Sequence, residues 1–113
     1  MEKNDKKGIV YLLGEWGKDG FYKIGVTKGS LEHRIKKLQT GNSGEIYVVS
    51  YFESEHPFFI EKQLHFKYKS HRAIGEWFEL TQEEMLNFKK DCTEIEDMIE
   101  IMKDNPFFPK KLR

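Results

Sequence analysis

The fold is decided by GIVYLL at residues 8–13 and FYKIGV at residues 21–26. β-Branched and aromatic side chains are frequent in both runs, which is typical of buried strands. The segment between them, GEWGKDG at residues 14–20, contains three glycines and an Asp-Gly pair, which is strong turn chemistry. We therefore expect the two runs to form an antiparallel hairpin.

A helix and a third strand are expected to follow the hairpin. Ser30 is a suitable N-cap, and Leu31, Ile35 and Leu38 repeat behind it at helical spacing. We expect this helix to end near Gly41, with that glycine in a left-handed conformation. The run IYVVSYF at residues 46–52 is the most strand-prone segment of the chain and predicts the third strand.

A second helix and a less certain extended segment come next. Pro57 fits the first turn of a helix that runs to about Lys69. The run WFEL at residues 77–80 predicts either a short strand or an extended segment, with Trp77 and Phe78 in the core.

The last helix is expected over residues 81–104. Thr81 and Glu84 have the spacing of a capping box, which marks its start. Apolar residues then recur in steps of three and four, the spacing of a coiled-coil seam: Met85, Phe88, Cys92, Ile95, Ile99 and Met102. Such a stripe either packs along the core of the same chain or forms a homodimer seam, helped by Met98 and Ile101.

These elements predict a small α+β fold, with a three-stranded antiparallel sheet flanked by helices and a long C-terminal helix. At 113 residues the chain has room for one compact domain. We expect residues 1–113 to form that domain, with its core at residues 8–80. The tail at residues 105–113 either packs back or frays.

The cysteine content and the hydropathy pattern indicate a reducing compartment. Cys92 is the only cysteine, which excludes an internal disulfide, and no His/Cys cluster indicates zinc. The polar N-terminal residues do not resemble a signal sequence, and no apolar run approaches membrane-spanning length. We expect a cytoplasmic protein with no membrane partner.

Charge is distributed unevenly along the chain. The formal net charge is zero, which by itself does not favour a nucleic-acid partner. Residues 1–72 carry an excess of Lys and Arg together with all the histidines, whereas residues 73–113 carry an excess of Asp and Glu. This asymmetry permits a basic binding face but is equally consistent with ordinary surface charge.

Five residues stand out before any family is considered. Lys23 lies within an apolar strand, where it either snorkels at a sheet edge or faces a functional cleft. Gly25 leaves room for another backbone or a phosphate to approach. Arg34 borders the buried face of its helix, either as an exposed residue or as a half-sheltered phosphate ligand. Glu61 and His65 share a helix face, which fits either a surface ion pair or a shared metal or water.

In sequence order these residues resemble the GIY-YIG nuclease superfamily, and most closely its T5orf172 or MUG113 branch. The resemblance covers residues 8–80. It also includes RIKKLQTGN at residues 34–42 and GEWF at residues 75–78. The matching positions are Gly8, Ile9, Tyr11, Tyr22, Lys23, Ile24, Gly25, Arg34, Glu61, His65, Gly75, Glu76, Trp77 and Phe78.

The resemblance implies an endonuclease that hydrolyses phosphodiester bonds with a single divalent metal, Mg²⁺ or Mn²⁺. Glu61 matches the family's metal-binding glutamate and would hold this ion. Arg34 would neutralise the phosphorane. Tyr11, in the first signature, would position or deprotonate the attacking water.

Lys23 departs from the superfamily pattern. Elsewhere the second signature supplies a tyrosine that is proposed as general base, and here Lys23 takes that place. Lys23 either acts as the base or stays charged and clamps phosphate, which leaves Tyr11 or His65 as the base. The expected substrate contacts are Tyr22, Gly25, Lys28, Lys37 and Asn42.

Two functions therefore compete. The leading hypothesis is an endonuclease of low or structure-directed specificity, because no separate DNA-binding motif is visible in the sequence; DNA is favoured over RNA as its partner. The alternative is a catalytically weak or inactive nucleic-acid-binding or interaction module on the same fold. The branch that the chain resembles points to a bacterial or phage-infected cell.

Overall fold

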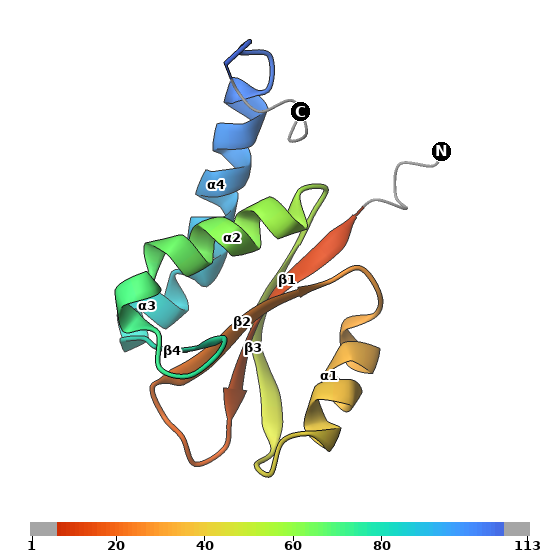
Figure 1. Cartoon of the computed structure of the whole chain (residues 1–113), viewed down its shortest axis with the longest axis vertical. Helices are drawn as coiled ribbons and strands as arrows, with labels where there is room; N and C mark the ends of the chain where they lie inside the picture. The colour runs from red at the N-terminus through yellow and green to blue at the C-terminus, as the bar shows by residue number, and fades with distance from the viewer. Residues whose placement is uncertain (1–6, 108–113) are drawn as a thin grey trace.

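The structure is a computed structural model that describes residues 7–107. Four strands form one antiparallel sheet in the order β3-β1-β2-β4 (Figure 1). They are β1 (Gly8–Glu15), β2 (Phe21–Thr27), β3 (Ile46–Ser54) and β4 (Trp77–Glu79). The prediction of an α+β fold is confirmed, but the prediction of three strands is one too few. The short segment β4 adds to the sheet because it pairs with the first three residues of β2.

The predicted hairpin is confirmed. β1 pairs with β2 from Ile9 opposite Thr27 to Gly14 opposite Tyr22. Gly17 and Gly20 in the turn have φ angles of 88° and 89°, a left-handed conformation that side chains other than glycine rarely adopt. The glycines therefore permit the reversal that brings β2 back along β1.

The alternation of side chains divides the core into two layers. On one face, α1 (Leu31–Thr40) packs against Tyr11, Leu13 and Ile46. The opposite face is covered by α2 (Pro57–Lys67) and α4 (Phe88–Met102), as Figure 1 shows. The cluster on this second face includes Val10, Leu12, Tyr22, Ile24, Ile60, Leu64 and Phe78.

The start of α1 is confirmed, but its end differs from the prediction. The hydroxyl of Ser30 accepts a hydrogen bond from the His33 amide at 3.1 Å. Gly41 follows the helix with φ −101° and ψ 11°, so it is not left-handed. The Gly41 amide donates instead to the Leu38 carbonyl at 3.2 Å, and this tightened last turn needs no left-handed residue.

The predicted second helix is nearly correct. Pro57 is its first residue, but the helix ends at Lys67, and a 3₁₀ turn, η2 (Lys69–His71), follows it. The buried carboxylate of Asp91 in α4 accepts hydrogen bonds from Tyr68 Oη at 2.7 Å and from Lys67 Nζ at 3.2 Å. These bonds hold the C-terminal end of α2 against α4.

The predicted C-terminal helix is interrupted. The capping box of Thr81 and Glu84 is confirmed, but it begins the short helix α3 (Gln82–Leu86). Asn87, with φ −86° and ψ 6°, separates α3 from α4. The Asn87 amide donates to the carbonyls of Glu83 and Glu84, and the Asn87 carbonyl accepts from the Asp91 amide, so backbone bonding carries across the break.

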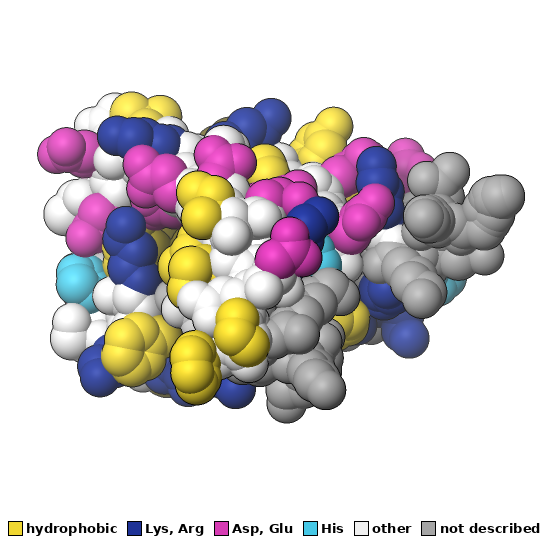
Figure 2. Space-filling model, turned by 90° about the horizontal axis from the view of Figure 1, so that it is seen from above, with side chains coloured by type: hydrophobic (Ala, Val, Ile, Leu, Met, Phe, Trp, Pro, Cys, Tyr) yellow, Lys and Arg dark blue, Asp and Glu magenta, His cyan; other side chains and the backbone are white. Residues whose placement is uncertain are grey.

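The apolar stripe of the last helix packs largely against its own chain. Phe88, Cys92 and Ile99 are buried, which confirms the first of the two expected arrangements. Met98 and Ile101 remain exposed, so the homodimer stays a prediction. On the face seen in Figure 2, acidic and basic side chains are interspersed with hydrophobic ones, and this face is not a basic surface.

Residues 1–6 and 108–113 lie outside the described residues, so whether the tail packs back or frays stays a prediction. Within residues 7–107, no helix is long and apolar enough to cross a bilayer.

Candidate functional site

Tyr11 and Arg34 form the centre of the site on the α1 face. Tyr11 is fully buried in β1, and its hydroxyl accepts a hydrogen bond from Arg34 Nε at 3.2 Å. This bond is the main cause that raises the pKa of Arg34 above its usual value, and the charge of Glu76 acts in the same direction. Tyr11 therefore fixes the position of a permanent cation.

Gly25 makes this arrangement sterically possible. It lies opposite Tyr11 in the β1–β2 register. A Cβ atom at Gly25 would lie 2.6 Å from two ring carbons of Tyr11. The space above Gly25, expected to admit a phosphate or another backbone, is thus occupied by the Tyr11 side chain.

Lys23 belongs to the same face of the sheet. Its Nζ atom lies 3.2 Å from Glu76 Oε1, and the side chain is only 16% exposed. The same ammonium lies 5.9 Å from the ring centroid of Trp77, which is opposite Lys23 in β4. An ammonium that is paired with a carboxylate is a hydrogen-bond donor, and this geometry favours the anion clamp over the base.

The shortness of β4 opens the edge of β2 next to Lys23. The β2–β4 pairing stops at Lys23, and the backbone of Ile24 instead bonds to Glu76 and His65. The Ile24 carbonyl accepts from His65 Nε2 at 2.9 Å, so Nε2 carries the hydrogen. Arg72 Nη2 donates to His65 Nδ1 at 3.1 Å, so both ring nitrogens of His65 are engaged.

Glu61 lies one helical turn before His65 and shares this edge. Its carboxylate is 3.8 Å from His65 Nε2. Burial raises the pKa of Glu61, and the charge of Glu76 adds to this effect, while the charge of Lys23 partly opposes it. The ionised carboxylate is therefore incompletely compensated by its neighbours.

Glu76 connects the charged groups of the site. It pairs with Lys23, and its charge acts on both Arg34 and Glu61. The structure thus gathers Tyr11, Lys23, Arg34, Glu61 and His65 around one edge of the sheet, from four different elements.

The expected substrate contacts separate into two groups. Lys37 and Asn42 line a cavity of about 310 Å³ together with Lys23, so they belong to the site's surroundings. Tyr22 is buried in the opposite core, because it alternates with Lys23 along β2. Lys28 is exposed just beyond β2 and lies near Gly8, not beside Lys23.

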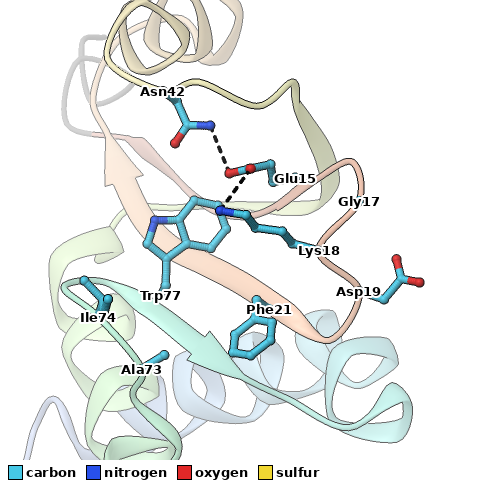
Figure 3. Close-up of a pocket in the computed structure, with 9 residues that line it drawn as sticks. All are labelled: Glu15, Gly17, Lys18, Asp19, Phe21, Asn42, Ala73, Ile74 and Trp77. Atoms are coloured by element: carbon cyan, nitrogen blue, oxygen red, sulfur yellow. Dashed lines mark hydrogen bonds and ion pairs between the residues drawn. The ribbon is translucent and has the colours of Figure 1, made fainter.

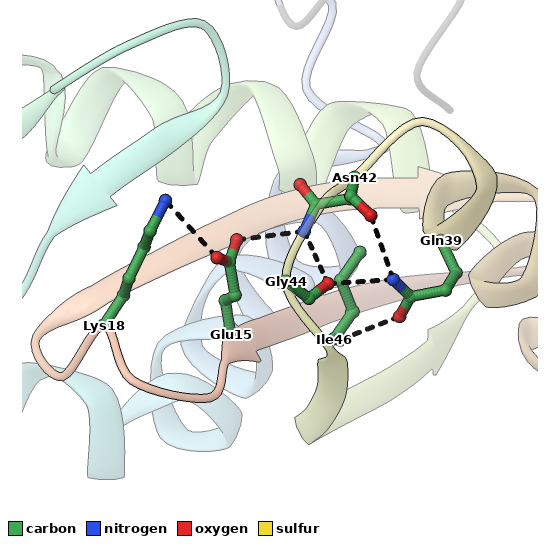
Figure 4. Close-up of polar contacts among 6 residues, drawn as sticks. All are labelled: Glu15, Lys18, Gln39, Asn42, Gly44 and Ile46. Atoms are coloured by element: carbon green, nitrogen blue, oxygen red, sulfur yellow. Dashed lines mark hydrogen bonds and ion pairs between the residues drawn. The ribbon is translucent and has the colours of Figure 1, made fainter.

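The amide of Asn42 has a structural function that the sequence did not reveal. Asn42 Nδ2 donates to Glu15 Oε1 at 3.0 Å and to the Gly44 carbonyl at 2.8 Å (Figure 4). Gln39 closes the same loop, because its side chain donates to the Gly44 carbonyl and accepts from the Ile46 amide. This network fixes the loop between α1 and β3.

The hydrogen bond from Asn42 is also the main cause that lowers the pKa of Glu15 below its usual value. Lys18 supports the same charge, with Nζ 3.3 Å from Glu15 Oε2. Glu15 is therefore a buried, ionised carboxylate held by two donors.

A larger cavity of about 600 Å³ adjoins the one beside Lys23. Asn42 and Trp77 line both cavities. Figure 3 shows the side chains of the larger cavity around the indole of Trp77. The complete lining is Glu15, Gly17, Lys18, Asp19, Phe21, Asn42, Ala73, Ile74 and Trp77.

Sequence reasoning missed part of this site. Trp77 was expected in the core but is only partly buried, whereas Phe78 is fully buried as expected. Alternation along β4 provided a signal, since two adjacent strand residues face opposite sides of a sheet. Glu15 and Arg72 gave no such signal. Only tertiary contacts bring Glu15 to the larger cavity and Arg72 to His65.

The fold and the site define a small α+β domain with two cations and a poorly compensated carboxylate at a sheet edge. The chain belongs to the T5orf172 domain family, whose model matches residues 8–100. This family is associated with nucleases, which supports a role that involves nucleic acid. No curated protein and no solved structure was found to match the chain.

Proposed function

We propose that this protein is a metal-dependent endonuclease of the GIY-YIG type that hydrolyses phosphodiester bonds of nucleic acid, DNA rather than RNA. The family supports this proposal, as does the resemblance of the two signatures. The observation that carries it is the convergence of Lys23, Arg34 and Glu61 near one sheet edge. Lys23 Nζ lies 3.2 Å from Glu76 Oε1, and Arg34 Nε lies 3.2 Å from Tyr11 Oη. Glu61 Oε2 lies 3.8 Å from His65 Nε2, which is bonded to the Ile24 carbonyl next to Lys23.

Lys23 and Arg34 bind the phosphate in this proposal. Tyr11 holds Arg34 by its Nε, which leaves the terminal guanidinium nitrogens as donors to phosphate oxygens. Lys23 supplies a second positive charge from the same sheet face. A phosphate that binds Lys23 replaces Glu76 as its partner, and Glu76 is half exposed and able to turn away.

Glu61 suits a divalent cation. Its side chain is 20% exposed and lies 3.8 Å from His65 Nε2, too far for a hydrogen bond, so its oxygens are able to bind a cation; burial raises its pKa. No group of three or more potential ligand side chains lies together within the described part of the chain. Mg²⁺ is commonly held by one or two carboxylates, with water and substrate phosphate completing its shell. When bound, Mg²⁺ or Mn²⁺ stabilises charge on the scissile phosphate and on the leaving oxygen.

Hydrolysis at this site depends on charge stabilisation and on one residue that positions the others. Water adds to phosphorus, the bond to the leaving oxygen breaks, and the proton lost by the water balances the one that this oxygen gains. Arg34 and Lys23 stabilise the negative charge that develops on the phosphate oxygens. His65 acts as a positioning residue, because its two nitrogens tie the Glu61 helix to Ile24 and Arg72.

Cleavage of plasmid and single-stranded DNA in Mg²⁺ or Mn²⁺ tests the proposal. We expect Glu61→Gln and Arg34→Ala each to lower the rate by about 100-fold or more, the scale of losing one charge-stabilising group. Glu83→Gln, on the exposed surface of α3, is the matched control and retains full rate. Cutting that survives both chelator and Glu61→Gln contradicts the proposal.

The second candidate is a binding module without efficient cleavage. The Lys23–Glu76 ion pair favours it, because Lys23 replaces a tyrosine and is engaged within the protein. In that case Lys23→Ala weakens binding to DNA, and no variant or metal changes the integrity of the substrate.

A further inference from the structure

The larger cavity has the composition of a site for one planar ring. Trp77, Phe21, Ile74 and Ala73 supply apolar and aromatic surface, while Glu15 and Asn42 supply polar groups (Figure 3). Its volume of about 600 Å³ is within the range of small-molecule sites. A nucleobase matches this lining, because it has an aromatic face that stacks and an edge that forms hydrogen bonds.

The polar wall presents acceptors. Both hydrogens of the Asn42 amide are accounted for by Glu15 and the Gly44 carbonyl, which leaves its side-chain oxygen to accept. Glu15 is a carboxylate of which only 7% of the side chain is exposed. Its Oε1 atom accepts from Asn42, and its Oε2 atom is paired with Lys18 Nζ at 3.3 Å, an exposed side chain that a ligand bound at Glu15 displaces. A carboxylate accepts two parallel hydrogen bonds from a ligand that carries two adjacent donors. Guanine is the nucleobase with such a pair, its N1–H and its exocyclic amine.

The cavity is connected to the phosphate site by a shared wall. Trp77 lines both cavities, and its ring lies 5.9 Å from Lys23 Nζ. Lys37 lies on the Lys23 side of this wall. A nucleotide can therefore place its phosphate near Lys23 and Lys37 and its base against the indole.

We infer that this cavity binds one unpaired nucleobase, preferentially guanine, next to the phosphate held by Lys23. The base stacks on Trp77, and its donor edge meets Glu15 and Asn42. This inference rests on the proposed function for the position of the phosphate. It makes the substrate a single-stranded or locally opened nucleic acid, since a paired base cannot present that edge.

Binding of short single-stranded oligonucleotides without metal tests the inference separately from cleavage. We expect Trp77→Leu to weaken binding about tenfold or more, the scale of losing one stacked base. Trp16→Leu is the matched control, because Trp16 is 65% exposed, stacks on Tyr47 and does not line the cavity. Circular dichroism and thermal melting establish that each variant is folded.

A measurement on the unmodified protein covers the case in which Trp77→Leu does not fold. In proton–nitrogen spectra, GMP should shift the indole N–H signal of Trp77 at lower concentration than UMP does, while the Trp16 signal stays in place. Glu15→Gln should reduce this preference to less than about twofold, because an amide cannot accept both donors.

The outcomes separate the two proposals. If the protein cleaves DNA but Trp77→Leu binds oligonucleotides as well as the Trp16→Leu control does, the base site is overturned and the endonuclease proposal stands. Equal shifts of the Trp77 and Trp16 indole signals also overturn the base site. Trp77-dependent binding without any cleavage supports the base site and overturns the endonuclease.

Discussion

Replacing Gly25 by alanine tests whether the packing of Tyr11 holds the centre of the site. The added Cβ would lie 2.6 Å from two carbons of the Tyr11 ring, well inside contact distance. Tyr11 is fully buried, so its ring cannot move without disturbing its neighbours. Overpacking of this kind costs about 1–3 kcal/mol. Alanine recovers about 0.4–1 kcal/mol by restricting the unfolded chain.

We therefore expect Gly25→Ala to lower the free energy of unfolding by about 1–2 kcal/mol. At roughly 3–6 °C per kcal/mol for a domain of this size, this corresponds to a loss of about 3–12 °C in thermal melting. A displaced Tyr11 ring also gives up its hydrogen bond with Arg34. The rate of DNA cleavage should therefore fall by more than the increase in the unfolded fraction explains. Urea unfolding monitored by circular dichroism measures the first effect.

Two variants make the result decisive. Gly29→Ala is the control, because the nearest atom to its added Cβ is Thr27 Oγ1 at 4.0 Å. In a Tyr11→Ala background the ring is gone, and Gly25→Ala should no longer be destabilising. A wild-type melting temperature for Gly25→Ala, or an unchanged cost in the Tyr11→Ala background, would refute the reasoning.

Two further predictions concern buried ionisable groups. Glu61 has a raised pKa in the folded state, so its ionisation opposes folding as the pH rises above about 4.3, its unfolded value. Glu61→Gln should therefore be more stable than the wild type in urea at pH 7, with the difference vanishing near pH 4; a less stable variant at pH 7 would contradict this. Cys92 is fully buried, and burial raises the pKa of its thiol to about 12. Its reaction with a thiol reagent should be limited by unfolding, and stability should decline above about pH 8.5 by up to about 1.4 kcal/mol per pH unit, a slope absent in Cys92→Ala. Rapid labelling in native buffer would overturn this second prediction.

The elements that the sequence predicted well depend on local interactions. Strand alternation and turn glycines defined the β1–β2 hairpin, and they also place Tyr11, Lys23 and Gly25 on one face. Ser30 and Thr81 were recognisable as caps because a cap bonds within its own first turn. The break at Asn87 was missed, because the apolar repeat continues through it unchanged.

The sequence by itself determined the hairpin, the starts of the helices and the order of the candidate site residues, since these follow from spacing and short-range bonding. Only the tertiary structure decided what those residues contact. It pairs Lys23 with Glu76, engages both nitrogens of His65, and turns Trp77 from an expected core residue into the wall between two cavities. The physical reason is that β4 joins the edge of β2 from more than fifty residues away. Packing of distant segments selects such a contact, and no local pattern encodes it.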